Sequence, residues 1–146
     1  MAFVGAGFLG IAHTIPQTHG TLVTAMHGHL AFWGAYAMII FAMIAYSMPL
    51  MTGRKLWDTP ASNYGFWISN IGMVAMTGAF AVAGITQVVL ERRTGIDFLA
   101  VQKEIEPHFL GLVLAASLFS IGIFLFILNF IRYGRPSDEA LGAPEY

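Results

Sequence analysis

Two histidines separated by one glycine, His27 and His29, lie about two turns inside an uncharged stretch, residues 21–48. An ionisable side chain is costly at that depth in a bilayer and is usually functional there. On an α-helix, residues two positions apart point about 200° away from each other, because each residue advances about 100° around the axis. The two imidazoles therefore cannot easily share one metal ion. Each can instead bind its own metal, on opposite faces of one helix.

Neutral imidazole is a common axial ligand of haem iron, so the pair indicates one helix held between two haems. The chain contains no cysteine, which excludes disulfides, thiolate metal sites and haem attached through a Cys-x-x-Cys-His motif. Any haem must therefore be bound without a covalent link. The alternative is that both histidines are ordinary packing residues, although the stretch around them contains no acid to pair with them.

The neighbours of the histidines distinguish two faces of the predicted helix. The face of His27 carries small or slim side chains that leave room for a flat macrocycle, namely Val23, Thr24, Ala31, Gly34 and Met38. The face of His29 carries Ala25 and three aromatic rings that can enclose a second haem, namely Phe32, Trp33 and Tyr36. Small residues are also common where membrane helices pack, and aromatic residues are common interfacial anchors, so both interpretations stay open.

The composition predicts the elements that must position these residues. Of all residues, 57% are hydrophobic and only 10% are charged, whereas a soluble domain carries about a quarter charged residues. No Asp, Glu, Lys or Arg lies in residues 1–53, 59–90 or 107–131, and each gap holds one apolar span of at least about 20 residues. We expect an all-α, integral membrane helical bundle with three transmembrane helices, near residues 21–48, 66–89 and 109–131.

The remaining segments frame this membrane part, which we place at residues 21–133. Residues 1–20 are expected to be the end of a truncated helix followed by a loop, which would indicate a truncated or split gene. Residues 134–146 form a polar tail that contains Pro136 and Pro144 and is expected to be disordered.

The charges restrict partners and orientation. A net charge of −1, with the basic residues in loops or at helix ends, leaves no electrostatic footprint for nucleic acid, which we exclude as a partner. Four basic residues flank the predicted spans on the side of the tail and three on the other side, which weakly favours a cytoplasmic carboxy terminus. The first group is Arg54, Lys55, Arg132 and Arg135, and the second is Arg92, Arg93 and Lys103.

The run 27–38, His-Gly-His-Leu-Ala-Phe-Trp-Gly-Ala-Tyr-Ala-Met, closely resembles a helix in the large subunit of bacterial nitric oxide reductase, of the haem-copper oxidase superfamily. Residues 18–21 and 83–92 support the resemblance, which covers most of residues 1–92 and becomes vague afterwards. It implies two b-type haems. By the same resemblance, His27 ligates the high-spin haem iron of the dinuclear centre and His29 ligates the low-spin haem iron.

The resemblance also implies an activity. The family reduces two molecules of nitric oxide to nitrous oxide and water in the bacterial inner (cytoplasmic) membrane, with electrons passing from the low-spin to the high-spin haem. The donor is a cytochrome c subunit or a quinol, and the sequence leaves this choice open. The family's non-haem iron ligands and second low-spin ligand have no counterpart here, so the chain resembles the carboxy-terminal quarter to third of a catalytic subunit. The remainder of that subunit is therefore the expected partner, and this chain alone is expected to be inactive.

Three further residues are of interest around the site. The resemblance suggests that His19, in the loop above the site, hydrogen-bonds a haem propionate, but a solvated loop histidine is at least as good an interpretation. Tyr36 is a candidate proton donor. His108 precedes the last predicted span, and we interpret it as a solvated interfacial histidine rather than a ligand.

Two alternatives remain beside the nitric oxide branch. One is an oxygen reductase of the same superfamily, which also uses a His-x-His helix. The other is a non-enzymatic three-helix membrane component that binds a metal through its histidines, with partners supplied by an oligomer.

Overall fold

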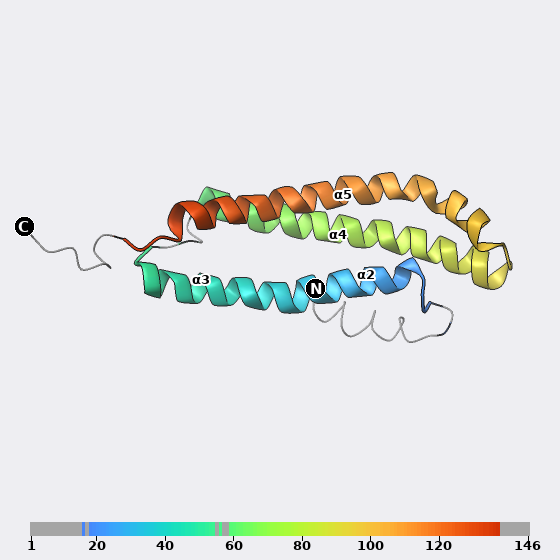
Figure 1. Cartoon of the computed structure of the whole chain (residues 1–146), viewed down its shortest axis with the longest axis horizontal. Coiled ribbons are helices and arrows are strands. Elements are labelled where there is room, and N and C mark those ends of the chain that lie inside the picture. Colours follow the sequence, from blue (N-terminus) through green and yellow to red (C-terminus); the bar gives the residue numbers. More distant parts are fainter. Residues whose placement is uncertain (1–15, 17, 55, 57–58, 138–146) are drawn as a thin grey trace, which may run out of the picture.

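The computed structural model describes residues 16, 18–54, 56 and 59–137, and over these residues it is helical (Figure 1). Its elements are α2 (Leu22–Ala31), the π-helix η2 (Phe32–Ala37), α3 (Met38–Thr52), α4 (Pro60–Val88), the π-helix η4 (Val89–Arg93) and α5 (Phe98–Tyr133). They join into three continuous rods, Leu22–Thr52, Pro60–Arg93 and Phe98–Tyr133, each long and apolar enough to cross a membrane. The predicted all-α architecture with three membrane-spanning helices is confirmed.

The helices are longer than the apolar segments that predicted them, because local caps rather than hydropathy set their ends. The first rod ends at Gly53, whose left-handed conformation (φ 67°) lets its N–H donate to Pro49 O at 2.9 Å. The second begins at Pro60, and the side chain of the preceding Thr59 accepts from Ser62 N–H at 3.2 Å. The expectations for residues 1–15 and 138–146 lie outside the described residues.

The largest difference concerns the third helix, which begins at Phe98 rather than near residue 109. Asp97 provides its cap, because the carboxylate accepts from Leu99 N–H at 3.1 Å. Val101 and Ile105, one turn apart, are both 0% exposed, whereas charged residues around them face outward. This segment is therefore an amphipathic first part of α5, and the charges that suggested a connecting loop belong to its exposed face. The helix runs on through Pro107 and curves along its length (Figure 1).

Glycines bring the second and third rods into backbone contact. A Cβ added at Gly122 of α5 would lie 2.7 Å from Cα of Ser69 on α4, and one added at Gly72 of α4 would meet the backbone of Phe119. Small residues at such positions let membrane helices approach closely. The α4–α5 pair is thus the tightest contact in the bundle.

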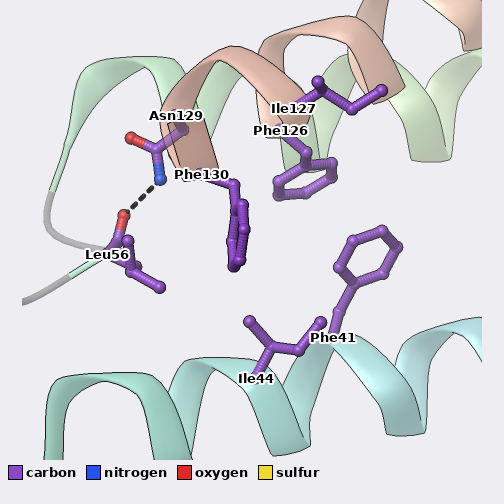
Figure 2. A pocket seen from close by; sticks show the side chains of 7 residues that line it. All are labelled: Phe41, Ile44, Leu56, Phe126, Ile127, Asn129 and Phe130. Atoms are coloured by element: carbon purple, nitrogen blue, oxygen red, sulfur yellow. Dashed lines mark hydrogen bonds between the residues drawn. The ribbon is translucent and has the colours of Figure 1, made fainter. Parts of the chain in front are cut away.

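At the far end of this pair, Asn129 ties α5 to the connection before α4. Its Nδ2–H donates to Leu56 O at 2.7 Å, and its Oδ1 accepts from Thr59 Oγ1. Figure 2 shows the bond to Leu56 beside an apolar pocket of about 320 Å³ that separates α3 from α5, with Phe41 and Phe126 facing each other across it. Helix α2, by contrast, packs directly on α4. The first rod therefore lies against its neighbours at the α2 end and leaves space beside α3.

Candidate functional site

The helix that carries the two histidines begins at a local cap. Thr21 Oγ1 accepts from Val23 N–H at 3.3 Å and donates to Thr18 O at 2.6 Å. Thr24 Oγ1 donates to the same carbonyl at 3.2 Å. These hydrogen bonds close the turn before α2 onto its first turn, so the residues that resemble the family motif here act as the start of the histidine helix.

Helix α2 and the start of η2 pack one stripe of their surface against the rest of the core. The buried members of the stripe are Val23, Met26, Leu30 and Trp33. Counting about 100° per residue, His27 and His29 lie about 80° to either side of this stripe. The two imidazoles therefore flank the contact with α4, one on each side, and open toward different surroundings. His27 is half-buried and His29 is exposed in the described part of the chain.

His29 is held in one tautomer by its own helix. Its Nδ1 lies 2.8 Å from Ala25 O, and because a carbonyl oxygen can only accept, Nδ1 carries the proton and donates it. In the neutral ring, Nε2 then keeps its lone pair. Metal-ligating histidines typically use this arrangement, in which one ring nitrogen donates to a carbonyl and the other binds the metal. The ring also packs against Phe80 of α4, with centroids 5.0 Å apart.

The largest cavity near this ring measures about 800 Å³, and its walls are overwhelmingly apolar. This volume lies within the roughly 300–1,000 Å³ typical of cofactor and ligand pockets. Besides His29, the lining residues are Ala25, Gly28, Phe32, Trp33, Ala37, Ile40, Phe41, Met73, Met76, Phe119 and Ile123. A Cβ added at Gly28 would meet nothing within 4 Å, so this glycine leaves open space beside the histidine. An imidazole with an available Nε2 in an apolar pocket of this size fits a non-covalently bound haem.

Most of the predicted His29 face lines this pocket, but Tyr36 does not. Tyr36 is 63% exposed, and its ring packs on Phe32 with centroids 5.5 Å apart. The cause is the π-helix η2, which begins at Phe32 and has more residues per turn than an α-helix, so an angular count of 100° per residue fails beyond Ala31. Met38 is displaced from the predicted His27 face for the same reason and packs against the core.

The predicted His27 face differs in one more respect. Val23 belongs to the buried stripe, where its backbone and side chain lie against Gly84 of α4. It is therefore not available to a macrocycle beside His27. No sequence pattern indicates this contact, because it depends on where α4 lies.

The other histidines lie apart from the pocket. His19 is exposed in the turn before α2 and does not line the cavity. His108 is half-buried in α5, where its Nδ1–H donates to Ile105 O at 3.3 Å. Across the part of the chain that the structure describes, no three His, Asp or Glu side chains gather as ligands of one metal ion.

Trp33 forms an anchored wall of the pocket that sequence reasoning did not foresee. Its Nε1–H donates to Asn70 Oδ1 of α4 at 3.3 Å, and its ring meets Phe119 of α5 edge-on with centroids 4.8 Å apart. Asn70 is in turn oriented by a 2.7 Å bond from its Nδ2–H to Phe66 O. A buried tryptophan needs an acceptor, and an asparagine inside an apolar span was the available signal.

Comparisons with known proteins extend this description. The family model described as "Cytochrome C and Quinol oxidase polypeptide I" matches residues 1–118. The B subunit of nitric oxide reductase from Stutzerimonas stutzeri is 36% identical over 148 residues, which covers 92% of this chain and 31% of that protein. "Cytochrome c oxidase subunit 1 homolog" from Agrobacterium tumefaciens (strain T37) is 34% identical over 76 residues, covering 51% of this chain and 14% of that protein. The chain thus spans less than a third of the length of either relative.

Proposed function

Because the chain belongs to the cytochrome c and quinol oxidase polypeptide I family, we propose that it is the haem-holding part of a nitric oxide reductase catalytic subunit. With its three spans it is a multi-pass membrane protein, and we place it in a bacterial inner membrane. The observation that carries the proposal is the hydrogen bond from His29 Nδ1–H to Ala25 O, which leaves Nε2 available beside a large apolar pocket.

The two histidines have separate roles in this proposal. His29 holds the low-spin haem iron through Nε2, and the Ala25 carbonyl fixes the orientation of its ring. His27, on the other side of the buried stripe, holds the high-spin haem iron. Bound haem supplies one-electron chemistry at iron, and the protein supplies binding, orientation and exclusion of water. Because both ligands belong to one helix, the helix itself sets the separation of the two irons.

The proposed reaction takes two nitric oxide molecules, two electrons and two protons to one nitrous oxide molecule and one water. Residues of this chain take part by positioning rather than by acid–base chemistry. The non-haem iron is supplied by other segments of the subunit, and the electrons come from a cytochrome c subunit or a quinol. His19 contacts a haem propionate at most, since it lies away from the pocket that His29 lines.

An oxygen reductase is the second candidate, since part of this chain is similar to a cytochrome c oxidase subunit 1 homolog. The nitric oxide branch is preferred because the likeness to nitric oxide reductase extends over 92% of the chain, against 51% for the oxidase homolog. Turnover of nitric oxide against oxygen by the complete subunit separates the two. A non-enzymatic metal-binding component would contain no haem when purified.

The ligand assignment is tested in a complete subunit that contains this segment. We expect His29→Ala to remove the low-spin haem spectrum and leave a substantial high-spin signal, and His27→Ala to do the converse. Alanine is a strong helix former, so neither substitution should break the span. His108→Ala is the matched control and should retain both signals, because His108 lies apart from the pocket. Retention of both haem spectra in correctly inserted His27 and His29 variants would defeat the assignment.

A further inference from the structure

The start of the histidine helix is hydrogen-bonded to a side chain far away in the sequence. Leu22 N–H donates to Oε1 of Gln87 on α4 at 3.0 Å, across 65 positions of the chain. Leu22 is the first residue of α2, so its N–H has no partner within the helix. Gln87 is only 5% exposed and provides that partner from the neighbouring helix. The bond fixes the height of α2 along α4.

A glycine on the same helix fixes how closely the two backbones approach. A Cβ added at Gly84 would lie 2.6 Å from Val23 N and 2.9 Å from Leu22 C. These are backbone atoms, which cannot swing aside as the end of a flexible side chain can. Gly84 and Gln87 lie one turn apart on α4, and both contact the first turn of α2.

The orientation of the Gln87 amide follows from its partners. A backbone N–H can only donate, so the atom that faces Leu22 is the oxygen, and Nε2 faces Glu91 Oε2 at 3.3 Å. Glu91 is itself 3.4 Å from the guanidinium of Arg92. The glutamine is thus held at both ends of its amide, which restricts the position of the acceptor that it presents to α2.

We propose that Gln87 and Gly84 are positioning residues that set the place of His29 relative to Phe80 and the apolar pocket. His29 lies about 10 Å along the helix from Leu22, and a continuous α-helix transmits a displacement of its first turn over that distance. The inference rests on the proposed ligation of haem iron by His29, because it is the position of this ligand that the two contacts control.

The test uses the complete subunit in membranes and a reversal of one hydrogen bond. Gln87→Glu keeps an acceptor for Leu22 N–H but sets a second carboxylate against Glu91. We expect it to shift the g-values and the midpoint potential of the low-spin haem. Adding Glu91→Gln restores a donor and acceptor between these two side chains with the direction reversed, and it should bring both values back toward the wild type.

The glycine contact has its own matched pair of variants. Gly84→Ala must push α2 away and is expected to shift the same two values, whereas a Cβ at Gly78 on α4 meets nothing within 4 Å. Gly78→Ala should therefore leave the spectrum and the potential unchanged. If Gly84→Ala fails to insert, the Gln87 and Glu91 pair decides the outcome.

The possible failures are distinguishable. If the wild type shows no low-spin signal that His29→Ala removes, the proposed function fails, and this inference fails with it. If that signal is present but Gln87→Glu matches the wild type, the positioning role alone is wrong. The same conclusion holds if Glu91→Gln does not restore the values that Gln87→Glu has shifted.

Discussion

Replacing Gly122 by alanine should separate the two helices that form the tightest contact in the bundle. The added Cβ would lie 2.7 Å from both Cα and Cβ of Ser69, whereas ordinary contacts of this kind are 3.4–4 Å. Because the nearest atoms belong to the backbone of α4 or are attached directly to it, no rotamer change relieves the clash. Helices α4 and α5 must therefore move apart by about 1 Å near this point.

The size of the effect follows from two opposing contributions. Overpacking of a well-packed core costs about 1–3 kcal/mol. Replacing glycine by alanine in a helix interior is worth roughly 0.8–1 kcal/mol in the opposite direction. Gly111→Ala on the same helix isolates the second contribution, because a Cβ there meets nothing within 4 Å. The Gly122 variant should be less stable than the Gly111 variant by about 1–3 kcal/mol.

The comparison can be made on this chain in mixed detergent micelles, with unfolding followed by tryptophan fluorescence. Because the chain contains no cysteine, a pair of cysteines introduced on α4 and α5 can also carry spin labels that report their separation. We expect the label distance to increase in the Gly122 variant and to stay constant in the Gly111 variant. Equal stabilities and equal distances in the two variants would refute the close backbone approach.

Two further predictions concern activity and orientation. The isolated, haem-loaded chain should not reduce nitric oxide, since the described residues provide no three-ligand metal group for the non-haem iron; turnover by the purified chain would contradict this. Reporter fusions after Gly53 and after Tyr146 should report the cytoplasm, and a fusion after Gly95, in the turn between the second and third rods, should report the opposite side. The reverse pattern would overturn the orientation that we derived from the basic residues.

The sequence predicted the architecture well because charge-free segments are a direct consequence of the bilayer. It predicted the ends of the helices poorly, since these depend on caps such as Asp97 and Gly53 that act over one or two residues. The first part of α5 was missed for another reason. Its charged residues suggest a loop when counted together, and only the spacing of Val101 and Ile105 identifies a buried helix face.

The candidate site was predictable as far as the α-helical count remained valid. His29, Phe32 and Trp33 do line one pocket, as the angular argument required. Tyr36 lies beyond the start of η2, and no rule based on periodicity anticipates a π-helix. The partners supplied by α4, namely Asn70, Gly84 and Gln87, were beyond reach because their roles depend on tertiary contacts.

The pocket beside His29 follows from an unequal distribution of contacts along the first rod. Close packing at Gly84 and the Gln87 bond hold its α2 end against α4. Farther along, cavities of about 800 Å³ and 320 Å³ adjoin the rod, and Phe41 lines both of them. Phe41 stacks on Phe126 of α5 with centroids 4.6 Å apart, so aromatic contact bridges a gap that backbone contact does not close. Empty apolar space costs packing energy, and the glycine-mediated contacts elsewhere allow the bundle to retain it next to the ligand that needs it.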